Sequence, residues 1–216
     1  MGAVAFSDFA DIPRSTFGAI VADPPWSFRN WSDKGKNRLP DAMVRQKGLA
    51  ERHYKTMPLS EIRALPVGDL AAKDCALFLW AVDCMLPEAI EVGRGWGFTF
   101  KTCAFTWAKQ KADGGFHIGL GYWTRGNPES CLLFTRGKPR RKSAAIRQLI
   151  VAQRREHSRK PEESRERVEA LVAGPYLELF CREPRAGWSA WGNQVGVEPV
   201  RPALQMVDPT RQGALL

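Results

Sequence analysis

Short apolar runs alternate with amphipathic segments along most of this 216-residue chain. Between the runs, residues 58–65, 86–97 and 160–174 have helical patterns, with proline near the start or glycine near the end. This alternation predicts an α/β fold, in which a mostly parallel sheet carries helices on both faces. The six runs with the composition of buried strands are residues 18–22, 75–81, 102–108, 130–135, 146–152 and 176–181.

One part of the chain departs from the alternation. The two strand candidates within residues 102–135 are joined by a glycine-rich loop with little helical pattern, which predicts an antiparallel, hairpin-like excursion at one edge of the sheet. Residues 27–53 lack periodicity and are interpreted as an active-site loop. The length suits a single domain, so we expect one domain over residues 1–196 and a loosely held tail over 197–216.

The net charge of +9 is concentrated in one segment. Residues 136–160 contain ten lysines and arginines and a single acid, Glu156, so the rest of the chain is close to neutral. A basic run can simply be a solvated surface. Here it is interrupted by "AAIRQLIVAQ", which is predicted to be a core strand, so the charges flank a folded element and favour an anionic polymer as partner.

Cysteine and histidine usage gives no sign of a disulfide framework or a metal centre. The five cysteines are odd in number and form no CxxC pair, and the three histidines have no ligand-like spacing. We therefore expect reduced thiols and no metal. The first residues lack a basic start, and no run approaches 18 apolar residues, so neither export nor membrane insertion is expected and a cytoplasmic location is favoured.

The stretch "ADPPW", residues 22–26, directly follows the first strand candidate. Ligands of open α/β sheets bind beyond the carboxyl ends of the strands, and two successive prolines make this turn stiff. The Asp23 carboxylate and the Pro24 carbonyl become two acceptors at a fixed separation, with few local donors to compete for them. Two acceptors suit an NH2 group, and Trp26 can stack on the ring that carries it. The stretch predicts a clamp for the exocyclic amine of a planar base; the alternative is a proline-rich surface turn anchored by a tryptophan.

Further motifs follow in a fixed order: "HYKTMPLSEIRALPV" before "ALFLWAV", then "WAKQ", "GYWTRGNPESCLLFTRG", "HSRKPEE" and "YLELFCREPRAGWSAWGNQ". With this ordered set the sequence resembles the MT-A70 (METTL-type) adenine-N6 methyltransferases from about residue 17 to 196. The resemblance implies a circularly permuted Rossmann-like methyltransferase that uses S-adenosylmethionine, in which the catalytic strand precedes the cofactor-binding strand. The sequence departs from other methyltransferases where "CREPR" replaces a glycine-rich cofactor loop.

The resemblance also implies roles for individual residues. Lys160 and Arg182 suit the carboxylate or ribose oxygens of the cofactor. An alternative makes both of them ordinary surface charges and Asn193 a turn residue; Trp188 and Trp191 are interpreted as core or lid residues. The implied residues are Asp23, Pro24, Pro25 and Trp26 for catalysis; Asp23, Lys160, Phe180, Arg182, Asn193 and Gln194 for the cofactor; and Trp26, Glu129 and Ser158 for the target adenosine.

The expected reaction is transfer of a methyl group to adenine N6, with the base flipped out or already unpaired. The basic segments 136–142 and 154–160, together with the loop of residues 27–53, are predicted to contact the nucleic-acid backbone. DNA is favoured over RNA because no accessory domain is recognised, and a monomer or a homodimer is compatible with the sequence. The alternatives are the same reaction on RNA, a non-catalytic nucleic-acid-binding scaffold, and a cytosine-N4 enzyme, which usually has serine where Asp23 stands.

Overall fold

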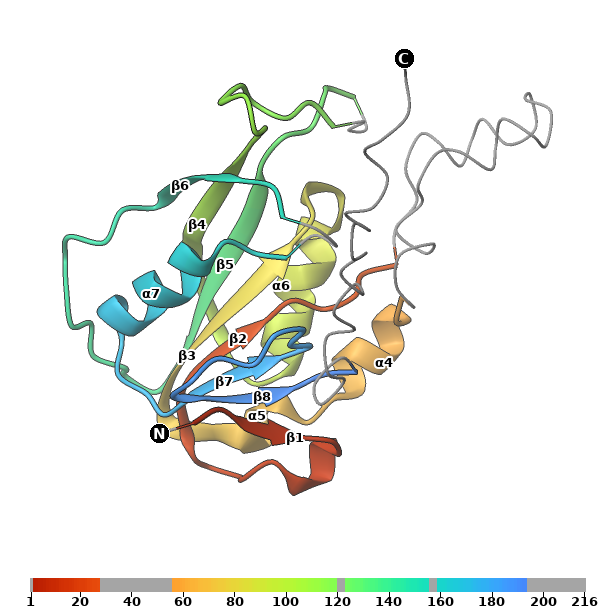
Figure 1. Cartoon of the computed structure of the whole chain (residues 1–216). Coiled ribbons are helices and arrows are strands. Elements are labelled where there is room, and N and C mark those ends of the chain that lie inside the picture. Colours follow the sequence, from red (N-terminus) through yellow and green to blue (C-terminus); the bar gives the residue numbers. More distant parts are fainter. Residues whose placement is uncertain (1, 28–55, 120–122, 156–158, 194–216) are drawn as a thin grey trace, which may run out of the picture.

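The computed structural model describes residues 2–27, 56–119, 123–155 and 159–193, which form one sheet with helices on both faces (Figure 1). The strands are β1 (Val4–Phe6), β2 (Phe17–Ala22), β3 (Ala71–Ala81), β4 (Thr99–Gln110), β5 (Glu129–Arg136), β6 (Leu149–Gln153), β7 (Tyr176–Leu179) and β8 (Trp188–Trp191). The helices are α4 (Leu59–Ala64), α5 (Val67–Leu70), α6 (Leu86–Gly95) and α7 (Glu162–Leu171), with short 3-10 turns at Phe9–Asp11 and Asp83–Met85. No helix within these ranges is long and apolar enough to cross a membrane.

The strand order of the sheet is β1-β8-β7-β2-β3-β5-β4-β6. Every described strand pair is parallel except the two made by β5, which is antiparallel to both β3 and β4. The predicted α/β class with a mostly parallel sheet is therefore confirmed. The antiparallel strand lies inside the sheet rather than at its edge, because β6 pairs with the outer side of β4 and extends the sheet beyond the β4–β5 pair.

The order along the chain agrees with a permuted Rossmann-like arrangement. Strand β2 lies between β7 and β3 in the sheet, although β7 comes more than 150 residues later in the sequence. All three strands are parallel, so their carboxyl ends meet at one edge of the sheet. The stretch after β2 and the stretch after β7 are thereby brought side by side, as the resemblance implied.

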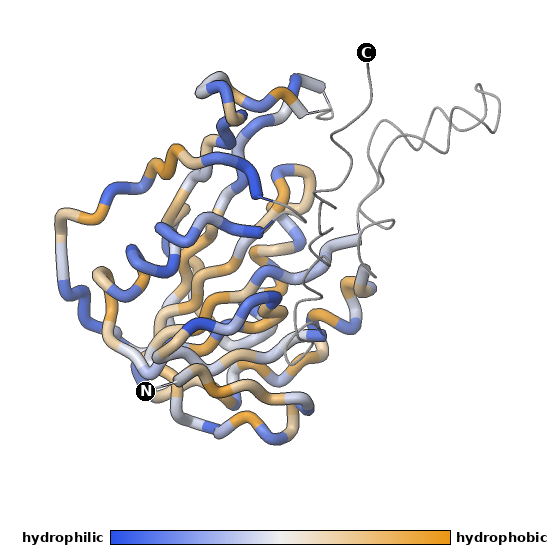
Figure 2. Tube along the Cα trace, in the orientation of Figure 1, coloured by the Kyte–Doolittle hydropathy of each residue, from blue (hydrophilic) through white to orange (hydrophobic). Residues whose placement is uncertain are grey.

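Alternate residues of the central strands enter two hydrophobic layers. On one face, Ile20 and Leu77 pack with residues of α4, α5 and α6, such as Val92. On the other, Phe78 packs with Val168 of α7, which confirms the apolar stripe predicted for that helix. The middle strands are hydrophobic along their length, whereas α7 is largely hydrophilic and contributes only its inner stripe (Figure 2).

The run of residues 146–152 forms an edge strand, so its prediction as a core strand was wrong. In β6 only Ile150 is fully buried, while Leu149 and Val151 are 55% and 43% exposed. An apolar run of five residues looks the same in sequence whether it pairs on one side or on two. The predicted loop of residues 27–53 and the tail from residue 197 lie almost entirely outside the described residues.

Candidate active site

The elbow formed by residues 23–26 is fixed by hydrogen bonds of its own backbone. The Asp23 N–H faces the carbonyl of Leu179 on β7 at 3.5 Å, and the Pro25 carbonyl accepts the Met57 N–H at 2.9 Å. The Pro24 carbonyl accepts the N–H of Trp26 at 2.8 Å, so the expectation of few local donors was wrong for this oxygen. A carbonyl oxygen can accept two hydrogen bonds, so Pro24 offers a shared acceptor.

Trp26 anchors the elbow from inside the protein. Its side chain is only 4% exposed and packs in the hydrophobic layer that contains Leu79. Its indole Nε1 donates to the carbonyl of Trp80 at 2.9 Å. A ring held in this way has no face open for a base, so the predicted stacking role of Trp26 does not fit the structure. Trp26 instead anchors the turn, as in the alternative interpretation of this stretch.

A chain of ion pairs runs from the elbow into the sheet. Lys160 Nζ lies 2.7 Å from Asp23 Oδ2 and 3.1 Å from Glu129 Oε2. Lys109 Nζ lies 2.6 Å from the other Glu129 oxygen, Oε1. All four side chains are between 11% and 20% exposed, and Lys160 also lies over the ring of Trp80, 5.5 Å from its centroid. Two lysines and two carboxylates make this Asp23–Lys160–Glu129–Lys109 chain neutral overall.

The pairing fixes the charge states within the chain. Burial alone would raise the pKa of Glu129, but the ammonium groups of Lys160 and Lys109 outweigh it and lower that pKa from 4.5 to about 2. Burial alone would lower the pKa of Lys160, but the carboxylates of Asp23 and Glu129 raise it above its ordinary value. Lys160 is therefore a fixed cation at neutral pH and cannot serve as a general base.

A cavity of about 590 Å³ opens beside Asp23 at the carboxyl ends of β2, β7 and β8. Four of the residues implied for the cofactor line it: Asp23, Phe180, Arg182 and Asn193. Lys160 lies on the other side of Asp23, in a narrow adjoining cleft that also contains Arg182. Gln194 and Ser158 lie outside the described residues. The remaining lining residues of the cavity are Ser7, Pro25, Thr56, Met57, Pro58, Glu61, Trp191 and Gly192.

Where other methyltransferases have a glycine-rich cofactor loop, the wall of this cavity has a turn with a strained backbone. Phe180, directly after β7, has a left-handed φ of +61°, which non-glycine residues rarely adopt and which is often found at functional sites. Next to it, Cys181 N–H donates to the carbonyl of Trp191 at 2.8 Å. A side chain on Gly192 would place its Cβ 2.3 Å from the carbonyl oxygen of Cys181, so only glycine allows the ends of β7 and β8 to approach this closely.

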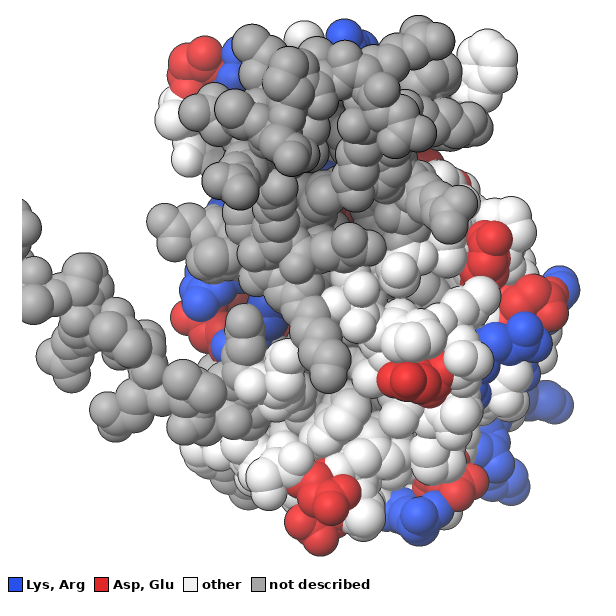
Figure 3. Space-filling model, turned by 90° about the vertical axis from the view of Figure 1, so that its right-hand side faces the viewer, with Lys and Arg blue, Asp and Glu red and all other residues white. Residues whose placement is uncertain are grey.

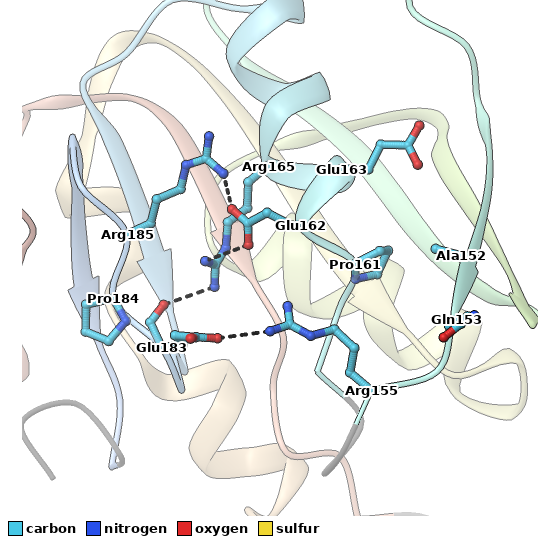
Figure 4. Close-up of a pocket in the computed structure, with 10 residues that line it drawn as sticks. All are labelled: Ala152, Gln153, Arg155, Pro161, Glu162, Glu163, Arg165, Glu183, Pro184 and Arg185. Atoms are coloured by element: carbon cyan, nitrogen blue, oxygen red, sulfur yellow. Dashed lines mark hydrogen bonds and ion pairs between the residues drawn. The ribbon is translucent and has the colours of Figure 1, made fainter. Parts of the chain in front are cut away.

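A second hollow, of about 610 Å³, lies between the start of α7 and the turn before β8 (Figure 4). Five of its six charged residues pair with one another: Arg185 and Arg165 with Glu162, and Arg155 with Glu183. Neither Asp23 nor any other residue of the ion-pair chain lines it. Its internal charge compensation is typical of a structural ion-pair network, and we assign the site to the cavity beside Asp23.

The two basic segments lie at opposite ends of the sheet. Arg136 pairs with Cys75 near the start of β3, because antiparallel β5 carries the chain away from the edge at which Asp23 lies. Segment 136–142 therefore begins at the end of the sheet opposite Asp23, and its predicted contact with the nucleic-acid backbone stays a prediction. The described residues of 154–160 follow the carboxyl end of β6 and do lie at the site edge. In the view of Figure 3, acidic and basic side chains of the described residues are interspersed along the right-hand and lower margins, and no large surface of one charge is seen there.

Two residues of the site were not predicted from the sequence. Lys109 belongs to the "WAKQ" motif, and its position after a strand candidate was the signal that could have identified it. Trp80 ends the run "CALFLW" and carries no polar signal, although its carbonyl receives the Trp26 indole and its ring lies under Lys160. Its role depends on contacts between strands that sequence spacing does not show.

Comparison with known proteins gives one family match and several relatives. The MT-A70 family model matches residues 17–194. The chain is 31% identical over 195 residues to the type II methyltransferase M.MunI of Mycoplasma sp, covering 87% of this chain and 81% of that protein. It is 31% identical over 200 residues to an MT-A70-like N(6)-adenosine-methyltransferase of Arabidopsis thaliana, covering 88% of this chain and 25% of that protein.

A third relative is the N6-methyladenosine RNA methyltransferase MTA1 of Cryphonectria parasitica, 29% identical over 188 residues. That alignment covers 83% of this chain and 52% of the fungal protein. The chain thus spans most of the Mycoplasma relative, but only about a quarter of the plant protein and about half of the fungal one.

Proposed function

Because this chain belongs to the MT-A70 family, whose members are S-adenosylmethionine-dependent adenine-N6 methyltransferases, we propose that it methylates the N6 amine of adenine in DNA. The observation that carries the proposal is the position of Asp23. Its carboxylate lies at the wall of the cavity at the carboxyl ends of the parallel strands, where ligands of such sheets bind.

The cavity residues fit S-adenosylmethionine. A volume of about 590 Å³ is in the range of small-molecule sites, and the lining combines apolar surfaces with a few polar groups. Arg182 offers a cation for the carboxylate of the cofactor, and Asn193 offers an amide for its hydroxyl or amino groups. Phe180 and Trp191, whose ring centroids lie 5.4 Å apart, offer an aromatic wall. When bound, S-adenosylmethionine supplies an electrophilic methyl group on a positively charged sulfur.

Asp23 and Pro24 act on the amine. The nitrogen of an aromatic amine is a weak nucleophile because its lone pair is conjugated with the ring. We assign to the Asp23 carboxylate and to the Pro24 carbonyl the role of accepting hydrogen bonds from the two N6–H groups, which orients the lone pair away from the ring plane and toward the methyl group. Pro25 stiffens the elbow, and buried Trp26 holds it against β3.

Lys160 keeps the catalytic acid in place. Its Nζ lies 2.7 Å from Asp23 Oδ2, and this ion pair fixes the orientation of the carboxylate before substrate arrives. Glu129, held by two lysines, and Ser158 are proposed to contact the target adenosine, and Gln194 is proposed to contact the cofactor. Ser158 and Gln194 lie outside the described residues. The proton released from N6 can leave after methyl transfer, so the site needs no strong base.

DNA is proposed ahead of RNA because of the share of each relative's length that this chain matches. The relative matched over most of its own length is named a type II methyltransferase, a designation of DNA-modifying enzymes. The relatives named for adenosine or for RNA are matched over a quarter to a half of their length. RNA remains the second candidate, because one of those relatives is named an RNA methyltransferase.

The test is a parallel transfer assay with the purified protein. Methyl-labelled S-adenosylmethionine is supplied with single- and double-stranded DNA and with RNA of the same sequence, and the digested nucleosides are identified by mass. The proposal predicts labelled N6-methyldeoxyadenosine at a higher rate than N6-methyladenosine. A higher rate on RNA would replace DNA by RNA as substrate, and label on cytosine would exclude the adenine reaction.

A further inference from the structure

The loop between β4 and β5 exposes large hydrophobic side chains to solvent. In its described parts, residues 111–119 and 123–128, Phe116 is 58% exposed, Ile118 71% and Trp123 89%. Of the six large hydrophobic side chains that are exposed in the described chain, these three fall within eight residues of sequence. Clustered exposed apolar groups cost solubility and commonly mark a binding surface.

This β4–β5 loop is a braced structure. The Asn127 side chain spans its base: Oδ1 accepts the Lys109 N–H at 3.0 Å, and Nδ2 donates to the Lys109 carbonyl at 2.9 Å and also to the carbonyl of His117. Farther along the loop from β4, the Gly119 N–H donates to the Gly126 carbonyl at 2.6 Å. The exposed side chains are therefore carried on a scaffold and need little further ordering on binding, which lowers the entropic cost of a contact.

The base of the loop is part of the catalytic ion-pair chain. Lys109 lies next to the last residue of β4 and Glu129 is the first residue of β5, and the two side chains pair at 2.6 Å. Glu129 in turn pairs with Lys160, which pairs with Asp23. The loop therefore rises from the same edge of the sheet at which the elbow lies, beyond β4 and β5 (Figure 1).

The surroundings of the exposed rings are basic. Lys111 and Arg125 belong to the loop, Arg154 Nη1 lies 3.3 Å from His117 Nε2, and the single acid in the described loop is Asp113. The pKa of His117 is lowered first by burial and then by the nearby cations Arg154, Lys109 and Lys111. Flat aromatic groups among cations match a ligand that has both bases and phosphates, that is, a nucleic-acid strand.

We propose that the β4–β5 loop is the element that engages the strand around the target adenine, with Trp123 stacking on an unpaired neighbouring base or entering the gap left by the flipped one. Phe116 and Ile118 extend the apolar contact, and Lys111, Arg125 and Arg154 contact phosphates. The inference rests on the proposed function and deepens it, since it names the surface that holds the polymer while Asp23 holds the base. Aromatic side chains in this role contact bases without reading a specific sequence.

The test compares Trp123→Ala and Phe116→Ala with a matched control, Val4→Ala, which shortens another exposed apolar side chain (52% exposed) on β1 at the far edge of the sheet. Dissociation constants for a fluorescent single-stranded DNA are measured by anisotropy at one fixed salt concentration, alongside KM for DNA, KM for S-adenosylmethionine and kcat. Loss of one stacked base predicts a roughly 5- to 150-fold weaker DNA affinity for Trp123→Ala. Trp123→Phe should recover most of the affinity, and KM for S-adenosylmethionine should stay unchanged.

The failures of the two proposals are separable. If the wild-type protein methylates DNA but Trp123→Ala and Phe116→Ala bind DNA as tightly as Val4→Ala, the loop inference is wrong and the proposed function stands. If the wild-type protein methylates no nucleic acid, the proposed function fails. Light scattering tests whether the loop instead binds a second copy of the chain. If the wild-type protein is a dimer, and Trp123→Ala makes it monomeric without weakening DNA binding, the loop is a dimer contact and the inference is overturned.

Discussion

Lys160 holds together two carboxylates that would otherwise repel each other across the site. Asp23 and Glu129 each lie within 3.1 Å of its ammonium group, and Lys109 provides the second positive charge that keeps the chain neutral. Partly buried charges persist only when they are compensated in this way. Lys109 is therefore a positioning residue, acting on Asp23 through Glu129 and Lys160.

Replacing Lys109 by methionine is expected to reduce the pH dependence of stability. Because the folded-state pKa of Glu129 is depressed from 4.5 to about 2, its contribution is present above pH 4.5 and is lost as the pH falls toward 2. Without Lys109 this pKa rises toward 4.5, so the decrease in unfolding free energy between pH 7 and pH 3 becomes smaller. Urea unfolding at pH 7 and at pH 3 measures this difference in unfolding free energy. Lys109→Arg should show the same difference as the wild-type protein. An unchanged difference in Lys109→Met would contradict the ion-pair assignment.

Asp23 was predicted correctly as an acid beside a cavity because the motif that carries it is local: a strand, an acid and two prolines in succession. The direction of the Trp26 ring was not predictable, because the same motif allows the ring to face solvent or the core. Lys109 and Trp80 were missed because their contacts join residues on different strands. Local sequence specifies the elbow, whereas its electrostatic partners come from tertiary structure.

Strands β7 and β8 shape the cofactor cavity through the close approach of their ends. Gly192 follows β8 and lies against the backbone of Phe180 and Cys181. This contact aligns the chain segments that bear Arg182 and Asn193 along one cavity wall. The spacing between two strand ends thus takes the place of a glycine-rich loop.

Gly192→Ala is expected to weaken S-adenosylmethionine binding about tenfold while the fold is retained. The added Cβ would lie 2.3 Å from the Cys181 carbonyl oxygen, so the end of β8 must shift, at an overpacking cost of about 1–3 kcal/mol. Calorimetric titration measures the affinity, and circular dichroism monitors the fold. Gly95→Ala on α6 is the control, since a Cβ there meets nothing within 4 Å. Wild-type affinity in Gly192→Ala would refute this account of the cavity wall.

The longer elements were predicted well and the short ones were missed. Helices α4, α6 and α7 and the six strands β2 to β7 coincide with predicted segments. All of these elements except β7 have at least five residues, enough to show a pattern, and β7 lies within the apolar run of residues 176–181. Strands β1 and β8 and helix α5 have only three or four residues, too few for a periodic signal. The position of β6 at the edge depends on pairing with β4, which its own sequence does not encode.

At the scale of the whole molecule, the described parts of the two basic segments lie at opposite ends of the sheet. Lys138 and Arg140 are exposed near the start of β3, whereas Arg154 and Arg155 follow β6 at the end where Asp23 lies. The predicted mostly parallel sheet was correct. The sequence did not indicate that the two basic segments emerge at opposite ends, because this depends on the antiparallel direction of β5.

This separation predicts different effects of two double substitutions on DNA binding. Arg154→Ala with Arg155→Ala should weaken binding and reduce the slope of log affinity against log salt by about 1 for each phosphate that the protein no longer neutralises. Lys138→Ala with Arg140→Ala removes the same charge at the other end and should leave the affinity within about twofold, since long-range attraction is screened beyond about 10 Å at 0.1 M salt. An equal weakening of binding in the two variants would mean that DNA extends over both ends of the sheet.

The central claim is that Asp23 activates adenine N6 for methyl transfer, and a single-turnover assay with wild-type protein and Asp23→Asn tests it most directly. Both proteins are mixed with saturating labelled S-adenosylmethionine and single-stranded DNA, and N6-methyldeoxyadenosine is quantified by mass. Loss of the charged acceptor is expected to slow the transfer by about 100-fold or more, with DNA binding retained. Formation of N6-methyldeoxyadenosine by Asp23→Asn at the wild-type rate would contradict the account.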